Sequence, residues 1–360
     1  MPFPTTSSEV TPEWLTENLR ASGVIGSDVS VTKAVPDPVA SGVGFMGEVA
    51  PIDLTYDGDT DAPTRMVAKI PTNDEMVRGL LAPAQVFERE ARFYQDVAPK
   101  LGDLVPQAYF VGCDVENDDY FLLMEDLGAA RCGDQAAGCS VEDARAAVQA
   151  IAAFHARFWE NDALAAIEWM PRMDDPGMKI GEVIYSSSID GFKAVFEHAI
   201  DPLCADIIDR FGPNVPQLLD RMAAMPNTVS HFDFRLDNLF FGDDGAVQMI
   251  DFQTSAKGGG IYDIGYLLSQ SVNTDDRRAH EDELLELYHD TLVANGVLNY
   301  GLDQIKADYR IGVLYSWVIP VFAVGSLDAS SERAMTLWTN VIQRAQAAML
   351  DHEVGEFLTV

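Results

Sequence analysis

Residues 231–253, HFDFRLDNLFFGDDGAVQMIDFQ, contain the side chains of this sequence that are best suited to chemistry. Asp233 could accept the proton of a hydroxyl group, and Asn238 follows it at a spacing that fits a loop. After a second apolar run, Asp251 adds another carboxylate. If LFF and VQMI pair as a hairpin, Asn238 and Asp251 lie together at one end of it. The side-chain oxygens of Asn238 and Asp251, beside a carboxylate that can act as a base, would suit an Mg²⁺ ion bound to a polyphosphate.

A second motif, SGVGFMGEV, places Gly42, Gly44 and Gly47 where backbone amides could approach phosphate groups. GxGxxG also occurs in dinucleotide-binding folds, where it follows a strand and opens a helix. Here the alternating strand pattern EVAPIDLTYDG comes next, which favours a hairpin. An NAD-dependent oxidoreductase is the alternative, and it depends on this motif alone.

Lysine is scarce in the chain, and Lys69 lies inside the apolar strand pattern MVAKI. A buried ammonium group is costly without an anionic partner. The helical pattern that follows offers Glu88 and Glu90. Lys69 is therefore either one half of an ion pair beside a binding site or a surface lysine on an exposed strand face.

Two kinds of structure must position these residues. Residues 28–124 contain five alternating strand patterns and one helical pattern at 81–98, which predicts a small sheet with one helix. From Ser140 onward the patterns become helical, with short strands expected only near 231–253. Further helices are expected at 189–211, 214–224, 278–295 and 302–349. We predict an α+β fold with an N-terminal lobe at 1–124, a linker at 125–138 and a helical C-terminal lobe at 139–360.

The charge of the chain limits its classes of partner. The sequence has 24 Lys and Arg against 57 Asp and Glu, a net charge of -33. Nucleic acids and anionic membranes are bound through clustered cations, so neither is expected as a partner. The acidity either attracts a cationic substrate or reflects solubility and adaptation to salt. We favour the second interpretation because the acidic residues are spread over the whole chain.

The N-terminal residues have neither the basic region nor the apolar run of a signal peptide, so a cytoplasmic location is expected. Residues 311–327 are uncharged, but they are short for a membrane span and contain Pro320, which favours a buried helix. The four cysteines show no spacing typical of a zinc site.

The spacing His-x-Asp-x-x-x-x-Asn followed by Ile-Asp-Phe resembles the catalytic loop and metal-binding motif of the protein-kinase-like fold. In detail it is similar to the aminoglycoside and choline phosphotransferases and the related ecdysteroid kinase-like proteins. The resemblance implies a bilobal fold with a small antiparallel sheet and a larger, mainly helical lobe. It implies that Asp233 is the catalytic base and that Arg235 contacts the transferred phosphoryl group. Asn238 and Asp251 would bind Mg²⁺.

The resemblance extends to the N-terminal half, over residues of about 40 to 270 in all. EARFY matches the family pattern E-x-x-F-Y, which implies that Glu90 pairs with Lys69 and that the lysine contacts the phosphates of ATP. YFLLMEDLG resembles the hinge of the family. Met124 would then lie behind the adenine ring, while the backbones of Glu125 and Leu127 bind its edge.

Other positions qualify the resemblance. GGGIYDIGYLL resembles the segment in which Asp263 braces the catalytic loop, and His155 is expected to be a packed core residue. Gln253 replaces the glycine of Asp-Phe-Gly, Phe232 replaces the arginine of His-Arg-Asp, and the sequence contains no Ala-Pro-Glu motif. These departures argue against a protein kinase regulated by phosphorylation, and they leave the phosphoryl-transfer residues intact.

We therefore predict an enzyme that transfers the γ-phosphoryl group of ATP, with Mg²⁺, to a hydroxyl group of a small molecule. A catalytically silent pseudokinase that binds nucleotide is the alternative. The acceptor could be an apolar alcohol or a polycationic aminoglycoside. An apolar pocket would be built from helical residues that could equally form a plain core: Trp169, Met170, Met173, Met178, Tyr185, Phe192, Tyr315 and Trp317.

Overall fold

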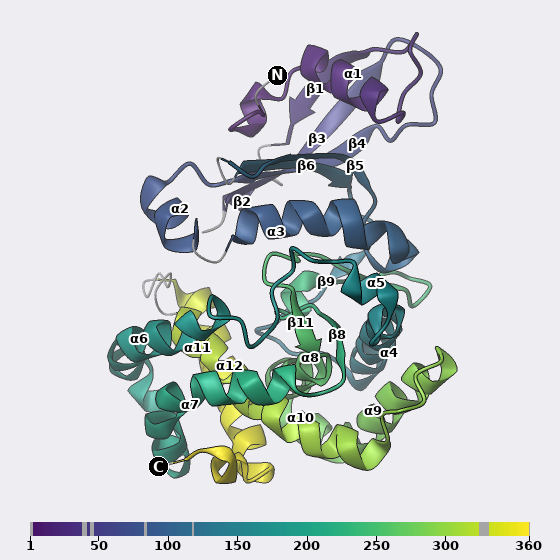
Figure 1. The fold of residues 1–360 in the computed structure, drawn as a ribbon. Coiled ribbons are helices and arrows are strands. Elements are labelled where there is room, and N and C mark those ends of the chain that lie inside the picture. Colours follow the sequence, from purple (N-terminus) through teal and green to yellow (C-terminus); the bar gives the residue numbers. More distant parts are fainter. Residues whose placement is uncertain are drawn as a thin grey trace. The chain divides into compact units, whose positions relative to one another are not determined.

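A computed structural model describes residues 3–37, 42–43, 47–82, 85–116, 119–323 and 331–359. The chain divides into two compact units, Met1–Ala129 and Ala130–Val360. This division lies within residues 125–138, the stretch in which the sequence places a linker. The first unit is a sheet with helices and the second is mainly helical (Figure 1), which confirms the predicted α+β fold.

The sheet of the first unit is antiparallel, in the order β1-β3-β4-β6-β5, and β2 pairs with β3. Its strands are β1 (Val31–Pro36), β2 (Gly42–Val43), β3 (Gly47–Tyr56), β4 (Arg65–Pro71), β5 (Ala108–Asp114) and β6 (Asp119–Glu125). Side chains alternate between the two faces of a strand. In β4 this places Met66, Ala68 and Ile70 in a buried apolar cluster, and it directs Lys69 to the opposite face.

Helix α1 (Pro12–Ala21) packs on the apolar face of the sheet, where the ring of Trp14 lies 4.7 Å from that of Phe121. The side chain of Thr11 accepts a hydrogen bond from the backbone N–H of Trp14, so Thr11 caps the helix. Helix α3 (Val86–Arg92) packs against β5 and β6 (Figure 1).

The helix expected at 81–98 is divided differently in the structure. Helix α2 (Glu75–Leu81) comes first. Asp74 fixes its start by accepting hydrogen bonds from two backbone N–H groups. Helix α3 begins only at Val86 and continues as a π-helical turn, Phe93–Val97. The sequence pattern therefore located the helix but not its start.

The second unit begins with β7 (Arg131–Cys132) and α4 (Val141–Phe158), and Ser140 caps α4, where the sequence places the start of the helical region. Its other helices are α5 (Asp162–Ala165), α6 (Gly181–Phe196), α7 (Ala205–Ala223), α8 (Ile261–Tyr266), α9 (Thr274–Ala294), α10 (Leu302–Ser316), α11 (Val318–Ala323) and α12 (Glu332–Asp351). A π-helical turn, Leu267–Ser271, follows α8.

The break expected between residues 211 and 214 does not occur. Helix α7 continues through Pro213 and Pro216. A proline inside a helix removes a backbone hydrogen bond and strains the preceding turn. Here the buried side chains of Phe211, Val215 and Leu218 hold one face of α7 in the core, and this packing outweighs the local cost.

Short strands interrupt the helices of the second unit. Strand β8 (Asn227–Ser230) pairs with β11 (Ala256–Gly259), and β9 (Leu239–Phe241) pairs with β10 (Val247–Met249). Both pairs are antiparallel, so the hairpin expected between LFF and VQMI is present. The segment between β8 and β9, residues 231–238, is called the 231–238 loop below.

Residues 311–323 contain the C-terminal end of α10 and all of α11, and much of this stretch is buried in the second unit. In the part of the chain that the structure describes, no helix is long and apolar enough to cross a membrane.

Candidate functional site

Asp263 holds the backbone of the 231–238 loop. Its carboxylate accepts hydrogen bonds from the backbone N–H groups of His231 (2.8 Å) and Phe232 (2.9 Å) and from the hydroxyl of Ser230 (2.9 Å). His155 lies 3.0 Å from the same carboxylate, and both side chains are fully buried. The predicted brace is therefore visible as contacts. It keeps Phe232 in a left-handed conformation, with φ of 69°, which a non-glycine residue adopts only at a cost.

The carboxylate of Asp233 is held at both of its oxygens. Oδ2 accepts hydrogen bonds from Nδ2 of Asn238 (2.9 Å) and Nε of Arg235 (3.4 Å). Oδ1 accepts one from the hydroxyl of Tyr266 (3.2 Å). The side chain of Asp233 remains 23% exposed, so it is ordered and still accessible.

Arg235 is paired inside the 231–238 loop. Its guanidinium contacts the carboxylates of Asp233 and Asp237. Burial alone would lower the pKa of Arg235. Asp233 and other nearby carboxylates outweigh burial, so the pKa of Arg235 is raised and its charge is maintained. Contact with a phosphoryl group remains a prediction for this residue.

Asn238 and Asp251 lie across the β9–β10 hairpin from one another. The backbone N–H of Ile250 donates to the carbonyl of Asn238 at 3.0 Å, and Asp251 is the next residue. Asp251 has φ of 68°, a second left-handed residue near the loop. Within the described residues, the Asn238 carboxamide donates two hydrogen bonds from Nδ2, to the backbone and side-chain oxygens of Asp233, and Oδ1 takes part in neither.

This donor set fits Mg²⁺. One carboxylate and one carboxamide oxygen are hard ligands, and Mg²⁺ takes its remaining ligands from phosphates and water. In the described residues, no group of three or more His, Cys, Asp and Glu side chains is placed to hold a metal ion. A site made by Asn238 and Asp251 would not form such a group.

In the first unit, Nζ of Lys69 lies 2.7 Å from Oε1 of Glu90. Their side chains are 15% and 1% exposed. The ion pair that the sequence suggests is thus formed, and Glu88 pairs instead with Arg92 on the same helix. Because the carboxylate is almost completely buried, it needs the ammonium group to compensate its charge. Nucleotide binding by this pair stays a prediction.

The glycine motif is described in part. Gly42 lies in β2 and pairs with Val49, so the motif lies on an antiparallel hairpin as expected, while Gly44 falls outside the described residues. A Cβ atom at Gly47 would lie 2.1 Å from the carbonyl oxygen of Ile70. Only glycine allows β3 to approach β4 so closely at this position.

The predicted adenine contacts lie at and after the end of β6. Met124 is opposite Val67 in β4 and is buried. The backbone N–H of Glu125 donates to the carbonyl of Gln107 at 2.8 Å, so this group is used inside the first unit. Leu127 follows β6 and is also buried. Adenine binding by Met124, Glu125 and Leu127 remains a prediction.

Comparison with known proteins identifies the family. A family model described as the ecdysteroid kinase-like family matches residues 41–298, well over half of the chain. The chain belongs to the ecdysteroid kinase-like family. No curated protein sequence matches the chain.

Solved structures support the fold of this family member. A choline kinase from Cryptosporidium parvum Iowa II is 12% identical, with 96% of this chain and 97% of the other covered and a TM-score of 0.56. A candidate aminoglycoside phosphotransferase from Ralstonia eutropha JMP134 is 17% identical, with coverage of 96% and 99% and a TM-score of 0.54. A mutant of aminoglycoside 2'-phosphotransferase IIIa in complex with GDP is 14% identical, with coverage of 94% and 99% and a TM-score of 0.52.

Two residues that support the 231–238 loop, Tyr266 and Gln135, were not indicated by the sequence. Gln135 is 2% exposed, and its Oε1 accepts hydrogen bonds from the backbone N–H of Leu236 (3.0 Å) and the hydroxyl of Ser271 (2.8 Å). Its backbone N–H donates to Asp237 at 3.0 Å. Arg344 of α12 donates to the carbonyl of Gln135 at 2.8 Å. These partners are far apart in sequence, and no local pattern indicates them.

Most of the eight residues proposed from the sequence for an apolar acceptor pocket are buried in the core of the second unit. Trp169 and Met178 are half-buried. The other six are 3% exposed or less: Met170, Met173, Tyr185, Phe192, Tyr315 and Trp317. Their burial favours the interpretation as plain core.

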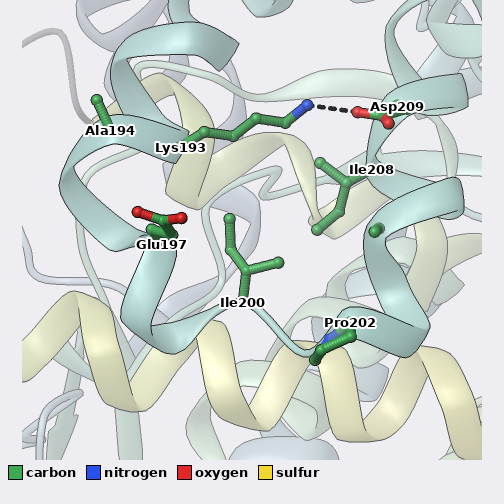
Figure 2. Close-up of a pocket in the computed structure, with 8 residues that line it drawn as sticks. Lys193, Ala194, Glu197, Ile200, Pro202, Ile208 and Asp209 are labelled. Carbon is green, nitrogen blue, oxygen red and sulfur yellow. Dashed lines mark hydrogen bonds and ion pairs between the residues drawn. The ribbon is translucent and has the colours of Figure 1, made fainter.

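A cavity of about 630 Å³ lies elsewhere in the second unit, and Figure 2 shows the residues that line it. Its apolar side chains include Ile200 and Ile208, and an ion pair joins Lys193 and Asp209 across it. None of the predicted site residues lines this cavity.

Proposed function

We propose that this protein transfers the γ-phosphoryl group of ATP to a hydroxyl group of a small molecule. The observation that carries the proposal is the arrangement around Asp233. Its carboxylate is held at both oxygens and partly exposed, beside an oxygen-donor pair at Asn238 and Asp251. Membership of a family of small-molecule kinases supports the same chemistry.

In the proposed reaction, Asp233 orients the acceptor hydroxyl and takes its proton. The hydroxyl oxygen forms a bond to the γ-phosphorus while the bond to the bridging oxygen of ADP breaks. The proton then leaves Asp233 for solvent. Ordering of the carboxylate matters because catalysis in this reaction class is mostly positioning and charge stabilisation.

The remaining charged groups would act on the nucleotide. Lys69, fixed by Glu90, would contact the phosphates of ATP, and Arg235 would contact the transferred phosphoryl group. Asn238 and Asp251 would hold Mg²⁺, which would supply positive charge against the phosphate groups of the nucleotide.

The nucleotide and the acceptor are separate questions. One solved relative carries GDP, so ATP and GTP should be compared directly. The acidic surface suits a polycationic aminoglycoside through charge, whereas an apolar alcohol would need a lining other than the buried residues named above. Competition between these two acceptor classes would distinguish them.

The test is a screen of Mg-ATP and Mg-GTP against hydroxylated metabolites, amino sugars and sterols, read by mass spectrometry. We expect a product heavier by one phosphoryl group with the wild type. Asp233→Asn should reduce its rate by about 10²–10⁴, the usual contribution of a general base. Asp243→Asn, the same chemical change in the exposed turn of the β9–β10 hairpin, is the matched control and should leave the rate unchanged.

A nucleotide-binding pseudokinase is the alternative. It would bind Mg-ATP and yield no phosphorylated product with any acceptor class. An equal rate in the wild type and Asp233→Asn would also overturn the proposed role of Asp233.

A further inference from the structure

We propose that Tyr266 is a positioning residue that fixes the carboxylate of Asp233 for phosphoryl transfer. The inference rests on the proposed function and adds a residue to it. Tyr266 ends α8 and is 1% exposed. Its hydroxyl donates a hydrogen bond to Oδ1 of Asp233 at 3.2 Å.

With this hydrogen bond, both carboxylate oxygens of Asp233 are bound. Asn238 and Arg235 bind Oδ2 of Asp233, and Tyr266 binds Oδ1. The last torsion of an aspartate is broad when only one oxygen is held. With both oxygens bound, the plane of the carboxylate is set, and the direction of its remaining lone pairs is set with it.

One turn of α8 contributes both the residue that binds the backbone of the 231–238 loop and the residue that binds the side chain of Asp233. Asp263 and Tyr266 are three residues apart, so they lie on the same face of the helix. Asp263 binds the backbone at His231 and Phe232, and Tyr266 binds the side chain of the next residue, Asp233. A shift of α8 would therefore move the loop and the base together.

The hydroxyl of Tyr266 acts as a donor. Burial raises its pKa well above the usual value, and the neighbouring Asp233 raises it further. The hydroxyl therefore keeps its proton and can bind the ionised carboxylate. Most buried tyrosine hydroxyls form a hydrogen bond, and the partner of Tyr266 is the proposed base, Asp233.

Tyr262 provides a matched control one turn earlier in α8. It is fully buried like Tyr266, and the rings of the two residues are 6.2 Å apart. Its hydroxyl has no hydrogen-bond partner in the part of the chain that the structure describes. Tyr262→Phe thus removes a buried hydroxyl from the same helix without touching Asp233.

The test compares Tyr266→Phe with Tyr262→Phe in steady-state kinetics. The readout is transfer to the acceptor found in the screen or, without one, release of ADP from Mg-ATP with water as acceptor. We expect Tyr266→Phe to lower kcat by roughly 10- to 100-fold, because a misplacement of about 1 Å at a reacting group can cost about 10² in rate. KM for ATP should stay unchanged, and Tyr262→Phe should match the wild type. A kcat for Tyr266→Phe within about twofold of the wild type, or an equal loss in both variants, would overturn the proposal.

A second measurement separates this inference from the proposed function. Tyr266→Phe is made in the wild type and in Asp233→Ala, and the midpoints of urea unfolding are compared. If the hydroxyl holds the carboxylate, the variant lowers the midpoint in the wild type and has a smaller effect without Asp233. Equal effects in both backgrounds would show that Tyr266 does not bind Asp233. If the wild type transfers no phosphoryl group at all, the proposed function fails. The comparison of urea midpoints would still show whether Tyr266 binds Asp233.

Discussion

The two units of the molecule hold their predicted functional residues in different ways. In the first unit, Lys69 forms an ion pair with Glu90, which lies 21 residues later in the chain and also accepts a hydrogen bond from the hydroxyl of Tyr120 at 3.4 Å. In the second unit, Asp233 and its loop are held by hydrogen bonds from several distant segments, including Gln135, Asp263 and Tyr266. The first unit relies mainly on one ion pair, whereas the second adds hydrogen bonds from the neutral donors Asn238 and Tyr266 to the ion pair of Asp233 with Arg235.

The difference matters for what each arrangement can tolerate. An ion pair fails when either partner is lost, because the other charge is left without compensation. A network loses one contact at a time, unless the residue removed accepts several hydrogen bonds at once. Asp263 is such a residue, since three donors and His155 meet at its carboxylate.

Of the substitutions compared for stability, Asp263→Asn should lower the free energy of unfolding the most. A carboxamide keeps one acceptor oxygen, so the donors on the other oxygen lose their partner while buried. We expect the free energy of unfolding to fall by about 3–5 kcal/mol. Urea unfolding would measure it, with Asp243→Asn as the control for the same chemical change at an exposed site. A loss no larger than that of the control would show that the brace is dispensable.

A smaller effect should come from the ion pair of the first unit. Glu90→Gln removes the compensating charge of Lys69 but preserves the shape of the side chain, and we expect a loss of about 2 kcal/mol in the free energy of unfolding. Glu88→Gln is the control, because its pair with Arg92 lies on the same helix and is more exposed. That variant should cost about 0.5 kcal/mol.

Equal losses in Glu90→Gln and Glu88→Gln would remove the distinction between the two pairs. A loss for Glu90→Gln that exceeds the loss for Asp263→Asn would reverse the comparison between the units.

The same contrast explains what could be predicted from the sequence. The strands of the first unit follow a two-residue alternation, and this pattern alone separates Lys69 from the apolar face that contains Met66 and Ala68. A scarce cation inside an apolar strand then indicates a carboxylate nearby. The hairpin that brings Asn238 toward Asp251 was predictable for a similar reason, because its two strands are close in sequence.

The network of the second unit could not be predicted in this way. Gln135 binds the backbone of Leu236, about a hundred residues away, and a backbone group leaves no pattern in the sequence. The continuation of α7 through Pro213 and Pro216 was missed because tertiary packing there outweighs local propensity. Family resemblance indicated Asp263 but not Tyr266, whose hydrogen bond depends on the exact position of α8.

One property is common to both units, and it should give the smallest effect. Residues 1–129 contain 8 Lys and Arg against 22 Asp and Glu, and residues 130–360 contain 16 against 35. Because both units are acidic, their charges repel over the whole chain rather than at one site. Salt screens this repulsion, with a Debye length of about 3 Å at 1 M. We expect molar KCl to stabilise the protein by roughly 1 kcal/mol, which raises Tm by about 2–4 °C.

Thermal unfolding across a KCl series would measure this effect. Asp59→Asn combined with Asp61→Asn, in an exposed turn of the first unit, removes two of the repelling charges and should reduce the gain from salt. A Tm that falls or stays flat with KCl would contradict adaptation to salt. The acidity would then be explained by solubility or by attraction of a cationic acceptor, because neither role gives a reason for stability to rise with salt.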